Sequence, residues 1–130
     1  MFLYNNVLEG IPFTVTEMTN LTVLDVSNNL LRTFPATLCN LVNLTQLYLR
    51  NNEIGSDDFP KDLRGLSGLR DINLSGNRLR HLPQSLFHLE GIVTTLYFFY
   101  CKVNYLFNSY FFSRIKKSFP WWKSTSGNLS

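Results

Sequence analysis

The stretch LTVLDVSNNLLRTFPATLCNL, residues 21–41, decides the fold of this chain. Its apolar residues match neither the 3.6-residue period of an amphipathic helix nor the two-residue period of an isolated strand. They follow the pattern L-x-x-L-x-L-x-x-N-x-L, continued by x-x-F-P-x-x-L-x-x-L, which is typical of a short structural repeat. The positions that define the pattern are Leu21, Leu24, Val26, Asn29, Leu31, Phe34, Leu38 and Leu41.

The same pattern recurs through the first two thirds of the chain. It starts again at Leu44 and at Leu69, and a shortened copy opens the chain. The third copy is longer because two extra residues fall within Gly55-Ser56-Asp57-Asp58, which we expect to form a loop rather than part of a stacked strand. The predicted repeats are residues 1–20, 21–43, 44–68 and 69–91, and together they form the predicted repeat domain, residues 1–91.

These recurring residues resemble the leucine-rich repeat family, in its intracellular form with repeats of about 23 residues. The resemblance implies an α/β solenoid of about four repeats, with a short parallel β-sheet on the concave side and short helices or 3-10 turns on the convex side. No single copy can bury its own leucines, so stability is expected to come from stacking. Residues 51–63 and 73–77 further resemble the family of leucine-rich repeat-containing protein 58, in which a lengthened repeat precedes a Leu-x-Leu-Ser-Gly-Asn strand.

The asparagine that recurs in every copy is predicted to be structural. It follows a short strand, and strand alternation sends one set of side chains inward and the other outward. An inward asparagine amide can bond backbone groups at the point where the chain leaves the strand, groups that would otherwise be buried without partners. The sequence therefore predicts a ladder formed by Asn6, Asn29, Asn52 and Asn77.

Outward strand residues are expected to stack in columns on the concave face, and they are the candidate protein-binding residues. Tyr48 and Arg50 are of the types that most often carry interface energy, and we expect Asp25 and Asp71 to orient Arg50. The same residues also suit the merely solvated side of a short sheet, and both interpretations stay open. Ser27 and Ser75 are expected to face outward as well. The candidate set is Val23, Asp25, Gln46, Tyr48, Arg50, Asp71 and Asn73.

The sequence offers no pattern for catalysis, cofactor binding or metal binding. His81 and His88 fall at loop positions, where solvated side chains are expected. Cys39 and Cys101 have neither metal-ligand spacing nor a disulfide framework, and no nucleotide-binding or zinc-protease motif occurs. We therefore expect a protein that is not an enzyme, holds no cofactor or metal and binds no nucleic acid, but binds another protein as a scaffold or adaptor.

The composition changes after Gly91. Residues 92–130 hold five of the twelve Lys or Arg and none of the nine Asp or Glu. Three interpretations stay open for this aromatic, basic tail: sequence unrelated to the repeats, a divergent cap, or a membrane span over residues 92–112 with basic residues after it. Lys102 and Asn104 lie inside that span and raise its insertion cost.

The location of the protein follows from the same features. The paired cysteines that cap many extracellular repeat domains are missing, and no signal peptide is visible. We expect a fragment of a longer repeat protein that is cytoplasmic and binds its partner through the concave face. The alternative is a membrane-anchored, receptor-like fragment held by residues 92–112.

Overall fold

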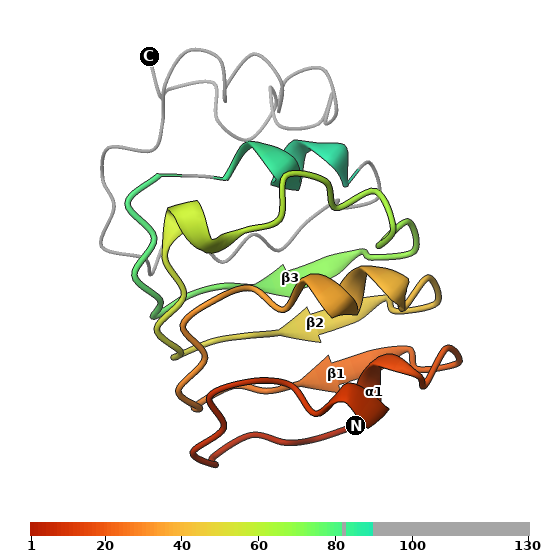
Figure 1. The fold of residues 1–130 in the computed structure, drawn as a ribbon, viewed down its shortest axis with the longest axis horizontal. Helices are drawn as coiled ribbons and strands as arrows, with labels where there is room; N and C mark the ends of the chain where they lie inside the picture. Colours follow the sequence, from red (N-terminus) through yellow and green to blue (C-terminus); the bar gives the residue numbers. More distant parts are fainter. Residues whose placement is uncertain (82, 90–130) are drawn as a thin grey trace, which may run out of the picture.

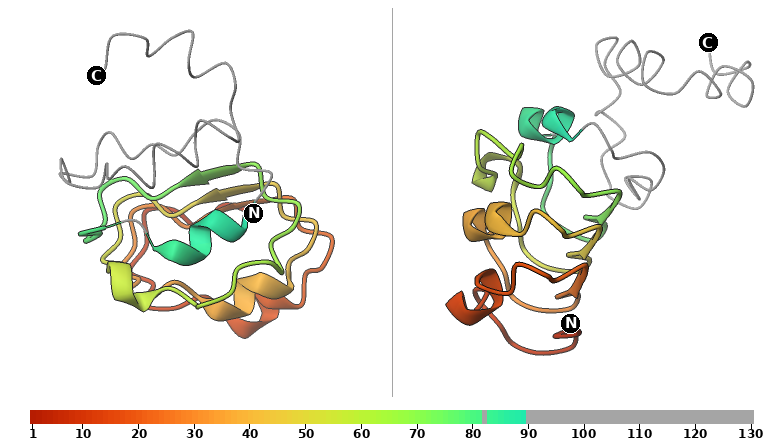
Figure 2. Two further views of the ribbon diagram at one scale, coloured as in Figure 1. Left: turned by 90° about the horizontal axis from the view of Figure 1, so that it is seen from above. Right: turned by 90° about the vertical axis from the view of Figure 1, so that its right-hand side faces the viewer.

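The structure, a computed structural model, describes residues 1–81 and 83–89. The chain winds in successive coils of similar shape, with the strands on one side and the helical turns on the opposite side (Figures 1 and 2). We call one circuit of the chain, from one strand to the next, a coil. The predicted α/β solenoid is confirmed. Its elements are α1 (Phe13–Thr16), β1 (Val23–Asp25), η1 (Ala36–Asn40), β2 (Gln46–Tyr48), η2 (Ser56–Asp58), β3 (Asp71–Asn73) and η3 (Gln84–His88), where η denotes a 3-10 helix.

The three strands form one parallel sheet in the order β1-β2-β3. Leu47 in β2 pairs with Leu24 on one side and with Ile72 on the other, so equivalent repeat positions lie in register across the sheet. Phe2 adds a parallel bridge to Asp25 at the edge of β1. Parallel neighbours need a long return connection between them, and each copy of the repeat supplies one.

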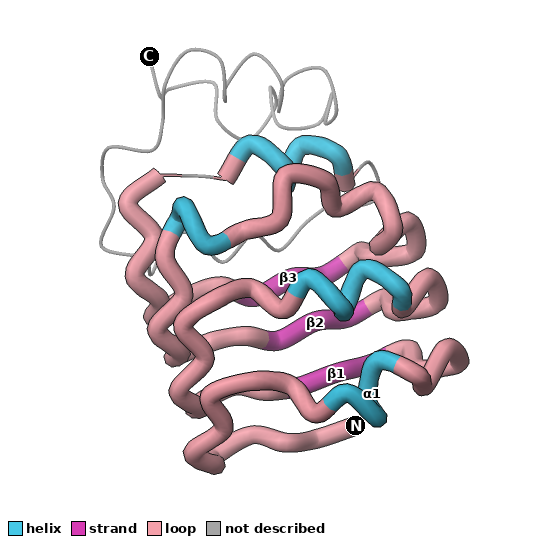
Figure 3. The backbone as a smooth tube through the Cα atoms, viewed as in Figure 1, coloured by secondary structure: helices cyan, strands magenta, loops and turns pink. Residues whose placement is uncertain are grey.

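The core lies between the strand side and the helical side of the coils (Figure 3). Apart from the half-buried Leu21, the apolar residues that define the repeat pattern in residues 21–41 are all buried, with 3% or less of their surface exposed. Each leucine removed from water contributes roughly 1.5–3 kcal/mol, and most do so against a neighbouring coil rather than their own. The members of this set are Leu24, Val26, Leu31, Phe34, Leu38 and Leu41.

Three of the helical turns begin directly after a proline. Pro12 precedes α1, Pro35 precedes η1 and Pro83 precedes η3. Proline suits this place because its missing N–H would have had no partner within the helix. The N–H of Leu38 donates to the Pro35 carbonyl at 3.0 Å and the N–H of Leu86 to the Pro83 carbonyl at 3.1 Å, the three-residue spacing of a 3-10 turn.

The third coil differs from the prediction. Its only helical turn in the described residues is η2, inside the inserted loop, whereas residues 61–66 form turns rather than a helix. The Oδ1 atom of Asp62 accepts the Arg64 N–H at 2.9 Å, a local bond that competes with helical pairing. Gly65 lowers the helix propensity further. The leucines of this segment are still buried, so the inward spacing is kept without the helix.

Candidate binding face and the asparagine ladder behind it

Asn52 shows how neighbouring coils are fastened together. Its side chain is buried, with 5% of the residue exposed. Its Oδ1 atom accepts the Leu31 N–H at 3.0 Å, and its Nδ2 atom donates to the carbonyls of Val26 and Leu49, each at 3.0 Å. Since Val26 and Leu31 belong to the preceding coil, one amide satisfies buried backbone groups of two coils.

The other ladder positions repeat this geometry, with one exception. Asn29 Oδ1 accepts the Leu8 N–H and Asn77 Oδ1 accepts the Ile54 N–H, both at 3.0 Å. Asn6 is exposed, and within the described residues it donates only to nearby carbonyls of its own coil. Asn6 therefore makes the same bonds within its own coil as Asn29 and Asn52, as predicted, but it is not buried, because the first coil of the structure has a neighbour on one side only.

A second row of residues precedes the ladder and was not predicted. Asn5, Asn28 and Asn51 have φ angles of 54–58°, and Gly76 has a φ angle of 69°. Left-handed backbone is tolerated best by glycine and asparagine, so their recurrence before each ladder asparagine was the available signal. At the surface Asn51 Nδ2 donates to Asn28 Oδ1 at 2.8 Å, which links the turns of adjacent coils.

The register of the sheet brings the predicted columns of outward residues together on the expected concave side, which we call the strand face. Asp25, Tyr48 and Asn73 lie side by side across β1, β2 and β3. All of them are half-buried, whereas Arg50, just beyond β2, is exposed. Tyr48 therefore lies between Asp25 and Asn73 in an ordered row, which the exposed Phe2 extends beyond Asp25. The second column, which is also half-buried, is Val23, Gln46 and Asp71.

Ser27 and Ser75 are buried rather than exposed, so their outward placement was wrong. The cause is the turn that ends each strand. Asp25 Oδ1 accepts the Ser27 N–H at 2.9 Å, and Asn73 Oδ1 accepts the Ser75 N–H at 3.0 Å and its hydroxyl at 2.7 Å. Short polar side chains commonly bond a backbone N–H two residues on in this way. Asp25 and Asn73 thus shape the edge of the strand face in addition to lining it.

The expected orientation of Arg50 by two aspartates is also wrong. Its guanidinium forms no ion pair with Asp25 or Asp71 in the described part of the chain. Asp25 instead uses a carboxylate oxygen to accept a backbone N–H. Among residues 1–81 and 83–89, Arg50 therefore has no carboxylate in an ion pair with its guanidinium.

Residues 1–81 and 83–89 contain no group of three or more His, Cys, Asp or Glu side chains able to hold a metal ion. No helix in these residues is long and apolar enough to cross a membrane. Partial burial, and then the nearby Asp62 carboxylate, raise the pKa of the Cys39 thiol, which keeps it protonated at neutral pH. The predictions made for the His88 side chain, Cys101 and residues 92–130, including the span over 92–112, lie outside what the structure describes.

Stacked coils, a registered parallel sheet and an internal asparagine ladder define a repeat solenoid, a class of protein that offers an extended surface for binding. Leucine rich repeat family models match residues 1–54, 43–66 and 68–89. The chain belongs to the leucine-rich repeat family. Domains of this family are generally protein–protein interaction modules and typically not enzymes.

Solved structures agree with this assignment. The chain is similar to a leucine-rich repeat protein of Leptospira interrogans, with 26% identity, a TM-score of 0.69 and 92% of this chain covered. It is also similar to the leucine-rich repeat ectodomain of the plant membrane receptor kinase GASSHO1/SCHENGEN3 from Arabidopsis thaliana, with 32% identity, a TM-score of 0.52 and 62% covered. The chain spans 29% of the first protein and 10% of the second. No curated protein matches the chain, so the resemblance to the family of leucine-rich repeat-containing protein 58 stays a prediction.

Proposed function

We propose that the protein is a scaffold or adaptor module that binds a protein partner through its strand face. The observation that supports this proposal is the placement of Tyr48 and Arg50 on the central strand and its edge, in a sheet whose neighbouring columns are in register. Tyrosine and arginine are enriched among the residues that dominate binding energy. The ladder behind the sheet fixes the backbone before binding, which reduces the entropy cost of association.

A related structure supports the same type of interaction. The GASSHO1/SCHENGEN3 ectodomain was solved in complex with CASPARIAN STRIP INTEGRITY FACTOR 2. That complex concerns the plant receptor, of which this chain matches 10%. We infer from it a mode of binding for this chain, a protein or peptide laid against the coils, and no particular partner.

The double variant Tyr48→Ala/Arg50→Ala is expected to abolish partner capture. It removes the aromatic ring and the guanidinium from the centre of the strand face, and loss of such residues commonly costs 2 kcal/mol or more of binding energy, about thirtyfold in affinity. The measurement is a pull-down from cell lysate followed by comparison of the captured proteins. Arg64→Ala, an exposed change on the return segment, is the matched control and should leave capture unchanged.

Folding must be checked beside this experiment because Tyr48 is half-buried. Arg50→Ala alone, at an exposed position, should change the free energy of unfolding by less than about 0.5 kcal/mol. It should still reduce capture. Identical captured proteins for the wild type and both variants would refute binding through the strand face.

We propose further that the protein is cytoplasmic, with membrane anchorage through residues 92–112 as the alternative. Lys102 within that stretch supports the first location, since a charged side chain is costly at the centre of a bilayer. Alkaline carbonate extraction of cell membranes is expected to leave the full chain in the supernatant. Retention of the chain in the membrane pellet would favour the anchored form instead.

A further inference from the structure

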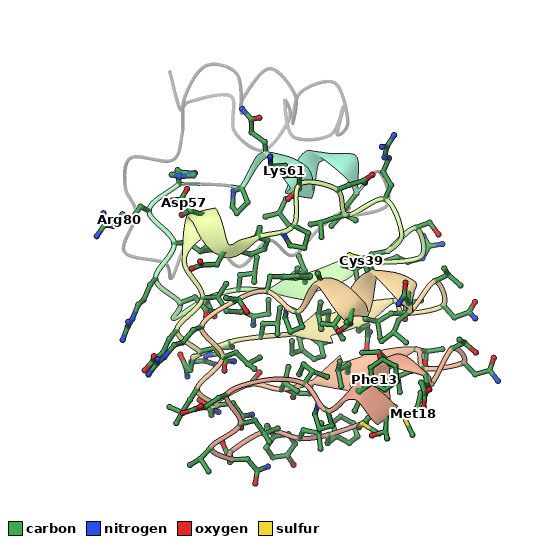
Figure 4. The ribbon with its side chains drawn as sticks, viewed as in Figure 1. Phe13, Met18, Cys39, Asp57, Lys61 and Arg80 are labelled. Atoms are coloured by element: carbon green, nitrogen blue, oxygen red, sulfur yellow. The ribbon has the colours of Figure 1, made fainter. Side chains whose placement is uncertain are left out.

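A cavity of about 580 Å³ lies beside the inserted loop of the third coil, away from the strand-face columns. Figure 4 shows two of its lining residues, Asp57 and Arg80, at one edge of the molecule, on the opposite side from Cys39. The residues that matter for its chemistry are three arginines, Arg32, Arg78 and Arg80, together with Glu53, Gly55 and Asp57.

Gly55 lies in the wall of the cavity. Arg32, Gly55 and Arg80 occupy the same repeat position in three consecutive coils, so the middle position has no side chain to separate the two arginines. A Cβ atom at Gly55 would lie 2.6 Å from the Asp58 carboxylate, which occupies the place of the absent side chain. The φ angle of −91° suits any residue. Glycine is therefore needed here for the close approach of Asp58 rather than for a special backbone.

Glu53 holds two of the arginines, one from each neighbouring coil. Its Oε2 atom lies 3.6 Å from Arg32 Nε, and its Oε1 atom lies 3.5 Å from Arg78 Nη2. Both arginine side chains are at least 70% exposed, so these ion pairs are worth little and are easily exchanged for others. Glu53 keeps the two guanidiniums close together, at the cost of their like-charge repulsion.

Arg80 is the third arginine, and its guanidinium has no hydrogen bond or ion pair in the described residues. Its backbone is nevertheless fixed. The buried hydroxyl of Ser56 accepts the Arg80 N–H at 2.7 Å and the His81 N–H at 3.0 Å, and it donates to the His81 carbonyl at 2.9 Å. A rigid loop therefore presents a free cation at the edge of the cavity.

The acids around the cavity already have partners. The Gly55 N–H donates to Asp58 Oδ2 at 3.1 Å, and Asp57 Oδ1 lies 3.4 Å from His81 Nε2. Glu53 is shared between its two arginines. Arg80 is therefore the one lining arginine whose guanidinium has no partner in the described residues, although the lining acids Glu53, Asp57 and Asp58 equal the three arginines in number.

We propose that this cavity binds a carboxylate side chain of an acidic peptide, with Arg80 as the first contact. Guanidinium groups bind carboxylates through two parallel hydrogen bonds, the strongest arrangement available to an exposed arginine. The incoming carboxylate competes with Glu53 for Arg78 and Arg32, so Glu53 acts as an internal competitor. The site is separate from the strand face and gives the module a second contact for an acidic segment.

The test is fluorescence anisotropy of the full chain with labelled hexaglutamate at low ionic strength, with labelled hexaglutamine as the uncharged reference. Arg80→Gln is expected to weaken hexaglutamate binding about tenfold, because it removes the paired charge-assisted hydrogen bonds of an exposed guanidinium. Glu53→Gln is expected to strengthen it about threefold, because it frees both partner arginines and removes a negative charge from the site. Opposite changes in hexaglutamate affinity for Arg80→Gln and Glu53→Gln are the result that the proposed competition predicts.

Matched controls separate this site from a general effect of net charge. Arg64→Gln and Asp62→Asn make the same two charge changes in an ion pair of 2.8 Å that does not line the cavity, and neither should alter binding by more than about twofold. Gly55→Leu retains every charge but displaces the Asp58 carboxylate, which lies 2.6 Å from the position of the new Cβ atom, and puts a bulky side chain in the wall of the cavity. It should abolish binding while the melting temperature confirms the fold. Any one of four results would overturn the proposal. Two concern the charges: equal effects of Arg80→Gln and Arg64→Gln, or weaker binding by Glu53→Gln. The other two are unaltered binding by Gly55→Leu and equal affinity of the wild type for hexaglutamine.

Discussion

Replacement of Asn52 by alanine is expected to lower the free energy of unfolding by about 1–3 kcal/mol, the cost of a buried polar group left without a partner. The Leu31 N–H loses the amide oxygen that accepts it, whereas the Val26 and Leu49 carbonyls keep the Asn29 and Asn77 amides as donors. Alanine offers neither donor nor acceptor, and a site with 5% exposure admits little water. Urea denaturation followed by circular dichroism measures the change.

Asn6→Ala provides the matched control. It makes the same chemical change at an equivalent repeat position, but Asn6 is exposed, and in the described part of the chain its side chain bonds only the Leu3 and Tyr4 carbonyls. Water can replace those bonds, so we expect a loss below about 1 kcal/mol. Equal losses for Asn6→Ala and Asn52→Ala would mean that burial of the ladder contributes nothing.

Leu47→Ala is expected to cost about 3–5 kcal/mol, the range for a fully buried leucine whose site cannot collapse. Leu47 is completely buried at the centre of the sheet, between Leu24 of β1 and Ile72 of β3. Its neighbours belong to three consecutive coils, and closing the cavity would require all three strands to shift together. A small solenoid of this kind has little stability to spare, so the variant is expected to be largely unfolded at 37 °C.

Leu30→Ala is the comparison for this second prediction. It removes the same atoms from a residue that is 40% exposed, at a turn position rather than in the core. The free energy of unfolding should fall by less than about 1 kcal/mol because little apolar surface returns to water. The two variants are compared by their urea midpoints under identical conditions, and a Leu30→Ala loss as large as that of Leu47→Ala would argue against the observed core.

The sequence was most informative where one position repeats with one physical role. Leu24, Leu47 and Ile72 fall at the same place in successive copies, and stacking alone determines their register. The inward asparagines could be predicted for the same reason, since every strand ends in the same bend. The exposure of Asn6 could not be predicted, because the repeat pattern carries no information about which coil has a neighbour on each side.

Features that depend on several side chains together were not predictable in this way. The burial of Ser27 results from a turn closed by Asp25, and the missing helix of the third coil follows from Asp62 and Gly65. The cavity beside the inserted loop could have been predicted only by comparing the position of Arg32, Gly55 and Arg80 across three copies. A single copy shows only one of these three residues, with nothing to indicate its neighbours in the stack.

The central claim is that the asparagine ladder fixes the coils and therefore the strand face. Native-state hydrogen exchange of the Leu31 amide, followed by NMR, tests it most directly, because that N–H donates to Asn52 Oδ1 rather than to another backbone group. We predict that Leu31 exchanges only through global unfolding, with the same free energy as the buried strand amide of Leu49, which donates to the Asn73 carbonyl at 2.8 Å. Exchange of Leu31 as fast as that of an exposed loop residue such as Thr33 would contradict the claim.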